Sequence, residues 1–288
     1  MMSLRHTGGA VARLSMRSGV LCAAVASLLA STSLWCQSLN GVSDAAQPPA
    51  SARAQAPVDM TGYWVSMVTA DWRFRMVVPG RGEYAGIPIS LEAKRFADAW
   101  SPAADEAAGK QCEAYGAGVI MQVPERLHIS WQDENTLQVQ TDAGMQSRLL
   151  YFKPSSTALQ APPSWQGTSV ARWLMQVLPE RNQKSPFAED SEQSSSKASS
   201  RPNGKLQIST RNMLPGLLRK NGVPYSEKST LTEYWEAHAD PNTGKQFLIV
   251  TTELTDPLYL HEPYVYNTLF EREADGSKWD PTPCSLRW

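Results

Sequence analysis

The sequence predicts a mainly β fold, an antiparallel barrel or strongly bent sheet of about nine or ten strands with one or two short helices. From Thr61 onward, short runs of alternating apolar and polar residues are separated by turns rich in Gly, Pro, Asn and Asp, which is typical of antiparallel sheet. An open sheet of that many strands would expose two unpaired edges, and closure removes them. No internal repeat divides residues 61–288, so we expect a single domain there.

The first hairpin is expected at 63–78. Alternation in its second strand, WRFRMVV, separates three apolar side chains from Arg73 and Arg75. If the apolar face packs into the core, the arginines are surface charges that pair with Asp71 or Glu83. If it packs outward, the arginines line a cavity and an acidic ligand is expected.

One helix is expected at 90–100, where four apolar residues recur at helical spacing and Ser90 is placed to cap the first turn. The following ten residues, 101–110, either form a second short helix or a loop. Residues 180–204 are rich in serine and poor in apolar side chains, which predicts a mobile insertion between strands. A further loop is expected at 214–227. The remaining strands are expected at 126–131, 136–141, 145–152, 164–177, 205–213, 229–238, 245–254 and 263–273.

The N-terminus has the features of a secretory signal peptide at 1–33, with basic residues, an apolar run at 19–30 and small residues for cleavage. The apolar run is shorter than the roughly 20 residues that a bilayer span requires; an uncleaved anchor helix is the alternative. Residues 34–60 are rich in Ala and Pro and predict a disordered tether. We therefore expect a periplasmic or secreted protein whose mature chain has no stable membrane span.

Two cysteines, Cys112 and Cys284, lie in the body of the chain. In an exported protein the economical expectation is that they form a disulfide, which would tie the end of the fold to its first third. A metal-binding or nucleophilic thiol is the alternative, but no Cys-x-x-Cys occurs and neither cysteine has a histidine within ten residues.

The stretch GYWVS places Gly62 and Trp64 in the Gly-x-Trp pattern of the first strand of lipocalins and other calycins, where the Trp closes one end of the barrel. A wider set of motifs, from Thr61 to Cys284, resembles a group of exported bacterial proteins of unassigned function. This resemblance implies a lipocalin-like antiparallel barrel and an export signal, and it implies no activity. By analogy only, lipocalin-like barrels carry small hydrophobic ligands, and some relatives are isomerases, cyclases or hydratases. The motifs are GYWVSMVTADWRFRM, LHISWQDENTLQVQTDAG and KWDPTPC.

Alternate residues of each strand would line the lumen of a barrel. In one long strand, Tyr234, Glu236 and His238 share one face, and Glu233 and Trp235 share the other. Aromatic faces with a few polar groups suit a terpenoid, a steroid or an aromatic acid, and they also suit an ordinary amphipathic core. Paired guanidinium N–H groups would hold the carboxylate of an acidic ligand. The candidate ligand-binding residues are Arg73, Arg75, Tyr115, Arg148 and Tyr266.

The candidate catalytic residues are Glu236, His238 and Tyr234, as an acid/base set at the end of one strand. The chain contains no Gly-x-Ser-x-Gly motif and no phosphate-binding glycine loop. No histidines or acids have the spacing of metal ligands, so neither a metal nor a cofactor is expected. Nucleic acid is excluded as a partner, because the net charge is −1 and the basic residues are scattered.

The leading hypothesis is an exported binding protein for a small hydrophobic or amphipathic molecule, which includes acidic ones. An isomerase, hydratase or hydrolase that acts on such a molecule inside the barrel is the alternative. A structural or interaction protein, which recruits a partner through residues 180–204 or 214–227, is the third hypothesis. Whether any reaction is catalysed stays open at this level.

Overall fold

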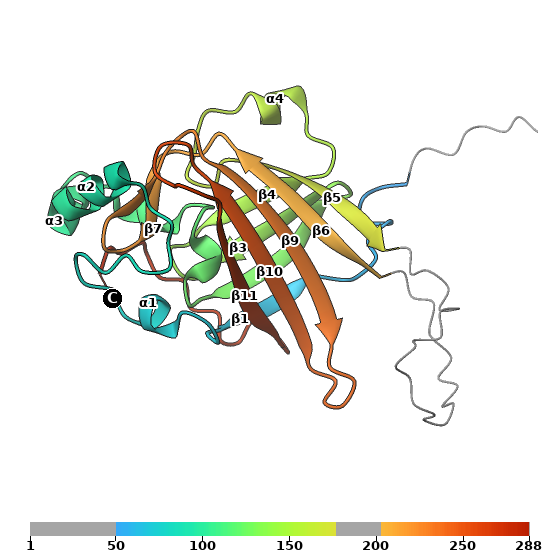
Figure 1. Ribbon diagram of the computed structural model, residues 1–288. Coiled ribbons are helices and arrows are strands. Elements are labelled where there is room, and N and C mark those ends of the chain that lie inside the picture. The colour runs from blue at the N-terminus through green and yellow to red at the C-terminus, as the bar shows by residue number, and fades with distance from the viewer. Residues whose placement is uncertain (1–49, 177–202, 288) are drawn as a thin grey trace, which may run out of the picture. The chain divides into compact units, whose positions relative to one another are not determined.

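Nine strands close into a barrel in the computed structural model, which describes residues 50–176 and 203–287 (Figure 1). The predicted signal peptide, the first part of the predicted tether and most of the serine-rich insertion lie outside the described residues. Around the barrel the strands run in the order β1, β11, β10, β9, β6, β5, β4, β3, β2. Their bounds are β1 Gly62–Met67, β2 Arg126–Asp133, β3 Thr136–Thr141, β4 Ser147–Tyr151, β5 Thr168–Gln176, β6 Asn203–Arg211, β9 Thr230–Ala239, β10 Gln246–Thr255 and β11 Tyr264–Glu273.

This barrel confirms the predicted mainly β, closed fold. Every pair of neighbouring strands is antiparallel except β4 and β5, which run parallel. A parallel pair needs a connection that returns to the starting end of the sheet. Residues 152–167, which contain the short helix α4 (Ser156–Leu159), make that connection.

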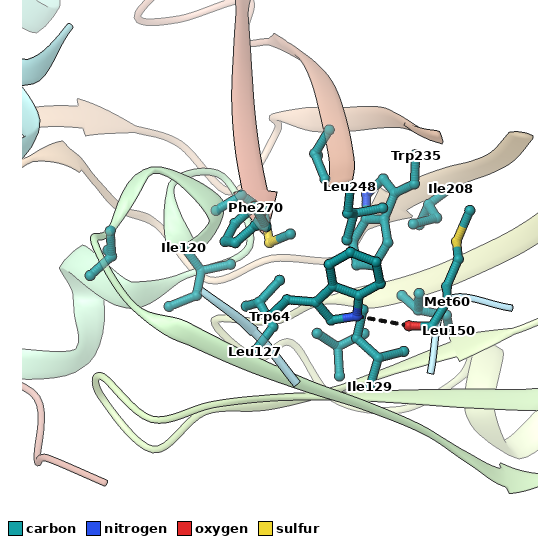
Figure 2. Close-up of a cluster of buried hydrophobic side chains, with 14 of the residues drawn as sticks. Met60, Trp64, Ile120, Leu127, Ile129, Leu150, Ile208, Trp235, Leu248 and Phe270 are labelled. Carbon is teal, nitrogen blue, oxygen red and sulfur yellow. Dashed lines mark hydrogen bonds between the residues drawn. The ribbon is translucent and has the colours of Figure 1, made fainter. Parts of the chain in front are cut away.

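The lumen is filled by side chains at the level of Trp64. Trp64, Trp235 and Phe270 are each 0% exposed, and aliphatic side chains from the surrounding strands pack between them. Figure 2 shows this cluster and the hydrogen bond that the Trp64 Nε1 donates to the Met60 carbonyl oxygen, at 3.0 Å. The bond satisfies the one polar atom of the indole, so the ring is buried without an unpaired donor. This end of the barrel is therefore a packed core.

The predicted second strand at 72–78 is wrong, because these residues form the helix α1 (Trp72–Met76). Strand β1 already pairs with β11 on one side and β2 on the other, so no free edge remains for a hairpin partner. Asp71, with a φ of 51°, turns the chain out of the sheet before the helix begins. The helical turn separates the two arginines that strand alternation had placed on one face.

The predicted loop at 214–227 contains a separate two-stranded antiparallel sheet, formed by β7 (Gly216–Arg219) and β8 (Val223–Tyr225). Both strands are buried on both faces. Strands buried on both faces show no alternation of apolar and polar residues, so the pattern that predicts half-buried strands misses them.

Residues 50–60, at the end of the predicted disordered tether, are ordered, because they pack against the barrel. The Ala52 carbonyl oxygen accepts a hydrogen bond from Trp173 Nε1 at 2.8 Å, and the Ala52 N–H donates to Asn135 Oδ1 at 3.1 Å. Met60 is buried in the core cluster. The prediction rested on a composition rich in Ala and Pro, and composition does not reveal the few side-chain contacts and backbone hydrogen bonds that anchor this segment.

The predicted helix is confirmed as α2, and Ser90 caps it by accepting from the Ala93 N–H at 3.1 Å. Its buried residues are Ala93 and Ala97, whereas Leu91 and Phe96 are exposed. The larger apolar side chains of this helix are therefore available to cover a surface outside the barrel. Helix α2 spans Leu91–Ala99, and it is followed by α3 Pro102–Ala107, η1 Gln111–Tyr115 and η2 Ile120–Gln122.

The predicted disulfide is confirmed, since Cys112 and Cys284 are bonded across a sequence separation of 172 residues. The bond joins η1 to the segment that follows the last barrel strand. Helices α1, α2 and α3 and strand β7 lie toward one end of the barrel (Figure 1). No helix within 50–176 and 203–287 is long and apolar enough to cross a membrane.

Candidate functional site

Arg148 and Tyr266, two of the predicted ligand-binding residues, are buried among the inward-facing side chains of the barrel. The Arg148 guanidinium forms an ion pair with the Glu233 carboxylate, and its Nε donates to Ser169 Oγ at 2.9 Å. The Tyr266 hydroxyl donates to the Gly118 carbonyl oxygen at 3.0 Å, and burial raises its pKa. Both side chains therefore bond to other groups of the protein.

The three predicted catalytic residues lie on the outer face of β9. Glu236 is exposed and forms an ion pair with Lys205 at 2.9 Å. His238 is exposed and lies against the Phe247 ring. Tyr234 accepts a hydrogen bond from Gln207 Nε2 at 3.1 Å. The inward face of β9 is instead the set that contains Glu233 and Trp235, so these candidates do not converge on the lumen.

The residue types expected of a ligand site come together outside the barrel wall, in a hollow of about 430 Å³ that we call the aromatic pocket. Its walls come from α2, η1, the β7–β8 sheet and the turn that follows β10. The volume lies within the range of roughly 300–1,000 Å³ that is usual for small-molecule sites. The lining residues are Phe96, Lys110, Glu113, Trp165, Leu214, Pro215, Gly216, Leu217, Pro224, Tyr225, Glu227 and Tyr259.

Glu113, from η1, gives the aromatic pocket a titratable group with an unusual pKa. Desolvation by burial raises the pKa of Glu113 to about 8, and the neighbouring carboxyl group of Asp105 raises it further in the same direction. Asp105 is itself held by the Trp100 Nε1, which donates to its Oδ2 at 2.5 Å. The buried Oε1 of Glu113 has no hydrogen-bond partner among the described residues. At neutral pH Glu113 is therefore a neutral carboxyl group that can both donate and accept a hydrogen bond.

Tyr225, from β8, also lines this pocket. Its hydroxyl is buried and has no hydrogen-bond partner within the described ranges. Burial raises its pKa, with a smaller contribution from the charge of Glu113. The space around the hydroxyl exists because residue 116 is a glycine: a β-carbon there would overlap the Tyr225 oxygen. Glycine at position 116 is therefore required for the observed position of this hydroxyl.

The two arginines of the predicted first hairpin differ in their exposure to solvent. Arg73 is exposed and forms an ion pair with Glu83. Arg75 is buried, and its Nε donates to the Gln122 carbonyl oxygen at 2.8 Å. It lines a second, much smaller cavity of about 40 Å³, which we call the basic pocket. Tyr115, another predicted residue, lies close by, because its hydroxyl accepts from Lys220 Nζ at 3.0 Å.

Sequence reasoning missed the most unusual residues of both pockets: Glu113, Tyr225, Arg219 and Lys220. Residues 219–222 read Arg-Lys-Asn-Gly, which is typical of an exposed turn, so no signal in the sequence marks Arg219 and Lys220 as buried. Glu113 carried no such signal, since its pKa depends on neighbours that folding supplies.

In the described part of the chain, no group of three or more His, Cys, Asp or Glu side chains is placed to hold a metal ion. Comparison with protein-family models, with curated proteins and with solved structures found no significant match to this chain.

Proposed function

We propose that this chain is an exported binding protein for a small amphipathic molecule, and that the ligand is held in the aromatic pocket. The observation that carries the proposal is the pocket itself, about 430 Å³ in volume and lined by aromatic and aliphatic side chains with a few polar groups. Ring-shaped or chain-shaped apolar ligands gain most from such a lining, because aromatic side chains bury large areas in fixed orientations.

The aromatic pocket is a better candidate than the lumen. Inside the barrel, Trp64, Trp235 and Phe270 pack against one another and against aliphatic side chains. The polar groups of the lumen are joined in the Arg148–Glu233 ion pair and its hydroxyl partners. A ligand there would have to displace a packed core, whereas the aromatic pocket requires no rearrangement.

The polar groups of the aromatic pocket suggest the chemistry of the ligand. Glu113, whose pKa is about 8, is neutral at pH 7, and the Tyr225 hydroxyl is buried without a hydrogen-bond partner among the described residues. Lys110, which forms an ion pair with Asp105 at 3.8 Å, adds a positive charge at the edge, and Glu227 adds a negative one. A ligand with an apolar body and a polar, oxygen-bearing end suits this mixed lining.

Export is supported by the disulfide, since bonds of this kind persist in oxidising compartments. The apolar run near the N-terminus is consistent with a signal peptide. The ligand would then be met in the periplasm or outside the cell. To test this part of the proposal, the full-length chain is expressed with a radiolabel or a tag and the cells are fractionated. The N-terminus of the mature form is then sequenced.

Binding is tested by purifying the mature protein from the periplasm and measuring the mass of any co-purifying small molecule by native mass spectrometry. The matched pair is Leu214→Glu, which places a charge in the aromatic pocket, and Leu159→Glu, which places the same charge on exposed α4. We expect the Leu214 variant to lose the ligand and the Leu159 variant to retain it. The fluorescent probe 1-anilinonaphthalene-8-sulfonate supplies a second measurement. If both variants retain the ligand equally, the aromatic pocket is not the binding site.

Glu113 and Asp105 favour a second candidate function, an enzyme that acts on the same ligand. Two carboxyl groups that share a proton, one of them with a pKa near the working pH, are the arrangement of general acid/base catalysis. The reaction would be an isomerisation, hydration or hydrolysis at the oxygen-bearing end of the ligand. Glu113→Gln separates the two functions, because it should retain binding and abolish any conversion of the captured ligand that mass spectrometry detects.

A further inference from the structure

A further hollow, of about 340 Å³, lies where residues 50–61 cross one end of the barrel, and we call it the end pocket. This end is the one away from α1 and α2 (Figure 1). The volume lies within the range of roughly 300–1,000 Å³ that is usual for small-molecule sites. The end pocket shares no residue with the aromatic pocket. Its lining residues are Arg53, Ala56, Val58, Asp59, Met60, Thr61, Trp131, Leu137 and Trp173.

Two indole rings of the barrel wall form the aromatic part of the end pocket. Trp131 follows Leu127 and Ile129 at every second position of β2, and those two side chains are 0% exposed, so Trp131 continues the inward face. Trp173, from β5, lies close by, because the Phe152 ring is 5.6 Å from the Trp131 ring and 5.2 Å from the Trp173 ring, between centroids. Both tryptophans are half-buried. Each therefore presents part of its ring to the pocket.

Hydrogen bonds join residues 50–61 to the wall of the end pocket. The Trp173 Nε1 donates to the Ala52 carbonyl oxygen at 2.8 Å, which fixes the orientation of the indole. The Ala52 N–H donates to Asn135 Oδ1, and the Arg53 N–H donates to the Glu134 carbonyl oxygen, both at 3.1 Å. The pocket is therefore formed before any ligand arrives, which lowers the entropic cost of binding.

The rim of the end pocket carries charges of both signs. The side chains of Arg53 and Asp59 are 56% and 65% exposed. Arg53 forms an ion pair with Glu134 at 3.6 Å, and Asp59 lies 3.8 Å from Arg272 Nη2 and accepts two hydrogen bonds from Thr61. Exposed pairs of this kind contribute little stability and exchange readily with solvent. Both groups therefore remain accessible to the hydroxyl groups of a ligand.

We propose that the end pocket binds a carbohydrate, with one sugar ring between the two tryptophans and the charged rim. A pyranose ring has an apolar face of C–H groups, which packs on an indole, and an edge of hydroxyl groups, which bond to a carboxylate and a guanidinium. A purely apolar ligand would remove the charged groups from water without replacing their hydrogen bonds. The opposite charges at the rim favour an uncharged, polyhydroxylated ligand over an ion.

The test begins with the mature, fluorescently labelled protein on a printed array of monosaccharides and oligosaccharides. Calorimetry then measures the affinity for each sugar that the array captures. Capture of monosaccharides supports a free sugar as the ligand, and capture of oligosaccharides alone supports the end of a glycan. If the array captures no protein and tryptophan fluorescence does not respond to the same sugars in solution, the proposal is wrong.

Variants of the wall and the rim locate the sugar. Trp131→Leu removes an aromatic face but keeps an apolar side chain, and it should weaken binding about tenfold or more. Trp131→Phe should restore part of the affinity. Trp279→Leu is the control, because this half-buried tryptophan packs on Tyr63 outside the end pocket, and it should leave the affinity unchanged. Asp59→Asn, at an exposed position, should weaken binding by a smaller factor and guards against a tryptophan variant that does not fold. Wild-type affinity in both Trp131→Leu and Asp59→Asn would overturn the proposal.

The end pocket and the aromatic pocket are tested independently of each other. Leu214→Glu, which alters the aromatic pocket, should bind the sugar with wild-type affinity. Trp131→Leu should retain any small molecule that co-purifies in the aromatic pocket. Loss of sugar binding in folded Leu214→Glu would place the sugar in the aromatic pocket and contradict the site proposed here.

Discussion

Arg148 and Glu233 form an ion pair inside the barrel, where the two side chains are 4% and 0% exposed. The pair joins β4 to β9, which are not neighbours in the sheet. The two strands between them each contribute a hydroxyl, because Arg148 also donates to Ser169 Oγ of β5 and to Thr210 Oγ1 of β6. One arginine therefore ties four strands together through the lumen.

Arg148→Met should lower the free energy of unfolding by about 3–5 kcal/mol, because it leaves the Glu233 carboxylate buried without a partner. The double variant Arg148→Met/Glu233→Leu should recover most of that loss, since no buried charge remains. Arg172→Met, on the exposed face of β5, is the control and should change stability by less than about 0.5 kcal/mol. Urea unfolding followed by tryptophan fluorescence measures all three. A double variant as unstable as the single one would contradict this account of the ion pair.

Replacing Cys112 and Cys284 together by alanine should lower the free energy of unfolding by about 2–5 kcal/mol, because the disulfide restricts the unfolded chain over a separation of 172 residues. Unfolding in urea, with and without a reductant, measures the loss. Thiol labelling of the denatured, unreduced protein is the control, and it should find neither cysteine reactive. Labelling at both positions would show that the bond does not form in the purified protein.

The stability contributed by Glu113 should fall as the pH rises. Its pKa is about 8 in the folded chain and near 4.5 in the unfolded chain, so the folded state binds more protons between these values. In that window the free energy of unfolding decreases with pH. Glu113→Gln should match the wild-type protein near pH 4.5 and exceed its stability at pH 8.5 by of the order of 1 kcal/mol, a value reduced by solvent screening of the half-buried carboxyl. Thermal unfolding across the pH range measures this difference, and a constant offset would argue against a raised pKa.

Gly116→Ala should destabilise the fold by about 1–3 kcal/mol, because the added methyl group overlaps the Tyr225 hydroxyl. Tyr225→Phe alone should be close to neutral, since the hydroxyl it removes is buried without a partner. The two changes together should cost less than Gly116→Ala alone. Gly80→Ala is the control, because a β-carbon there meets only the Glu83 side chain at ordinary contact distances. Chemical unfolding measures the cycle, and strictly additive losses would mean that the hydroxyl does not cause the clash.

The sequence by itself determined the class of fold and several of its parts. Alternation placed the barrel strands, Ser90 and the helical spacing after it marked α2, and the presence of just two cysteines within residues 61–288 indicated their bond. These features are local, or follow from the compartment, and each depends on the chemistry of the residues concerned. Barrel closure followed from a general rule about exposed sheet edges.

Tertiary structure decided everything that depends on neighbours from distant parts of the chain. Alternation in β9 separates Glu233 from Glu236, but only the closure of the sheet turns Glu233 inward and leaves Glu236 in solvent. Residues 72–76 alternate like a strand and become a helix, because both edges of β1 are already occupied. The raised pKa of Glu113 and the convergence of Arg75 with Arg219 and Lys220 arise in the same way. Burial and proximity are properties of the packed chain, and no residue carries them alone.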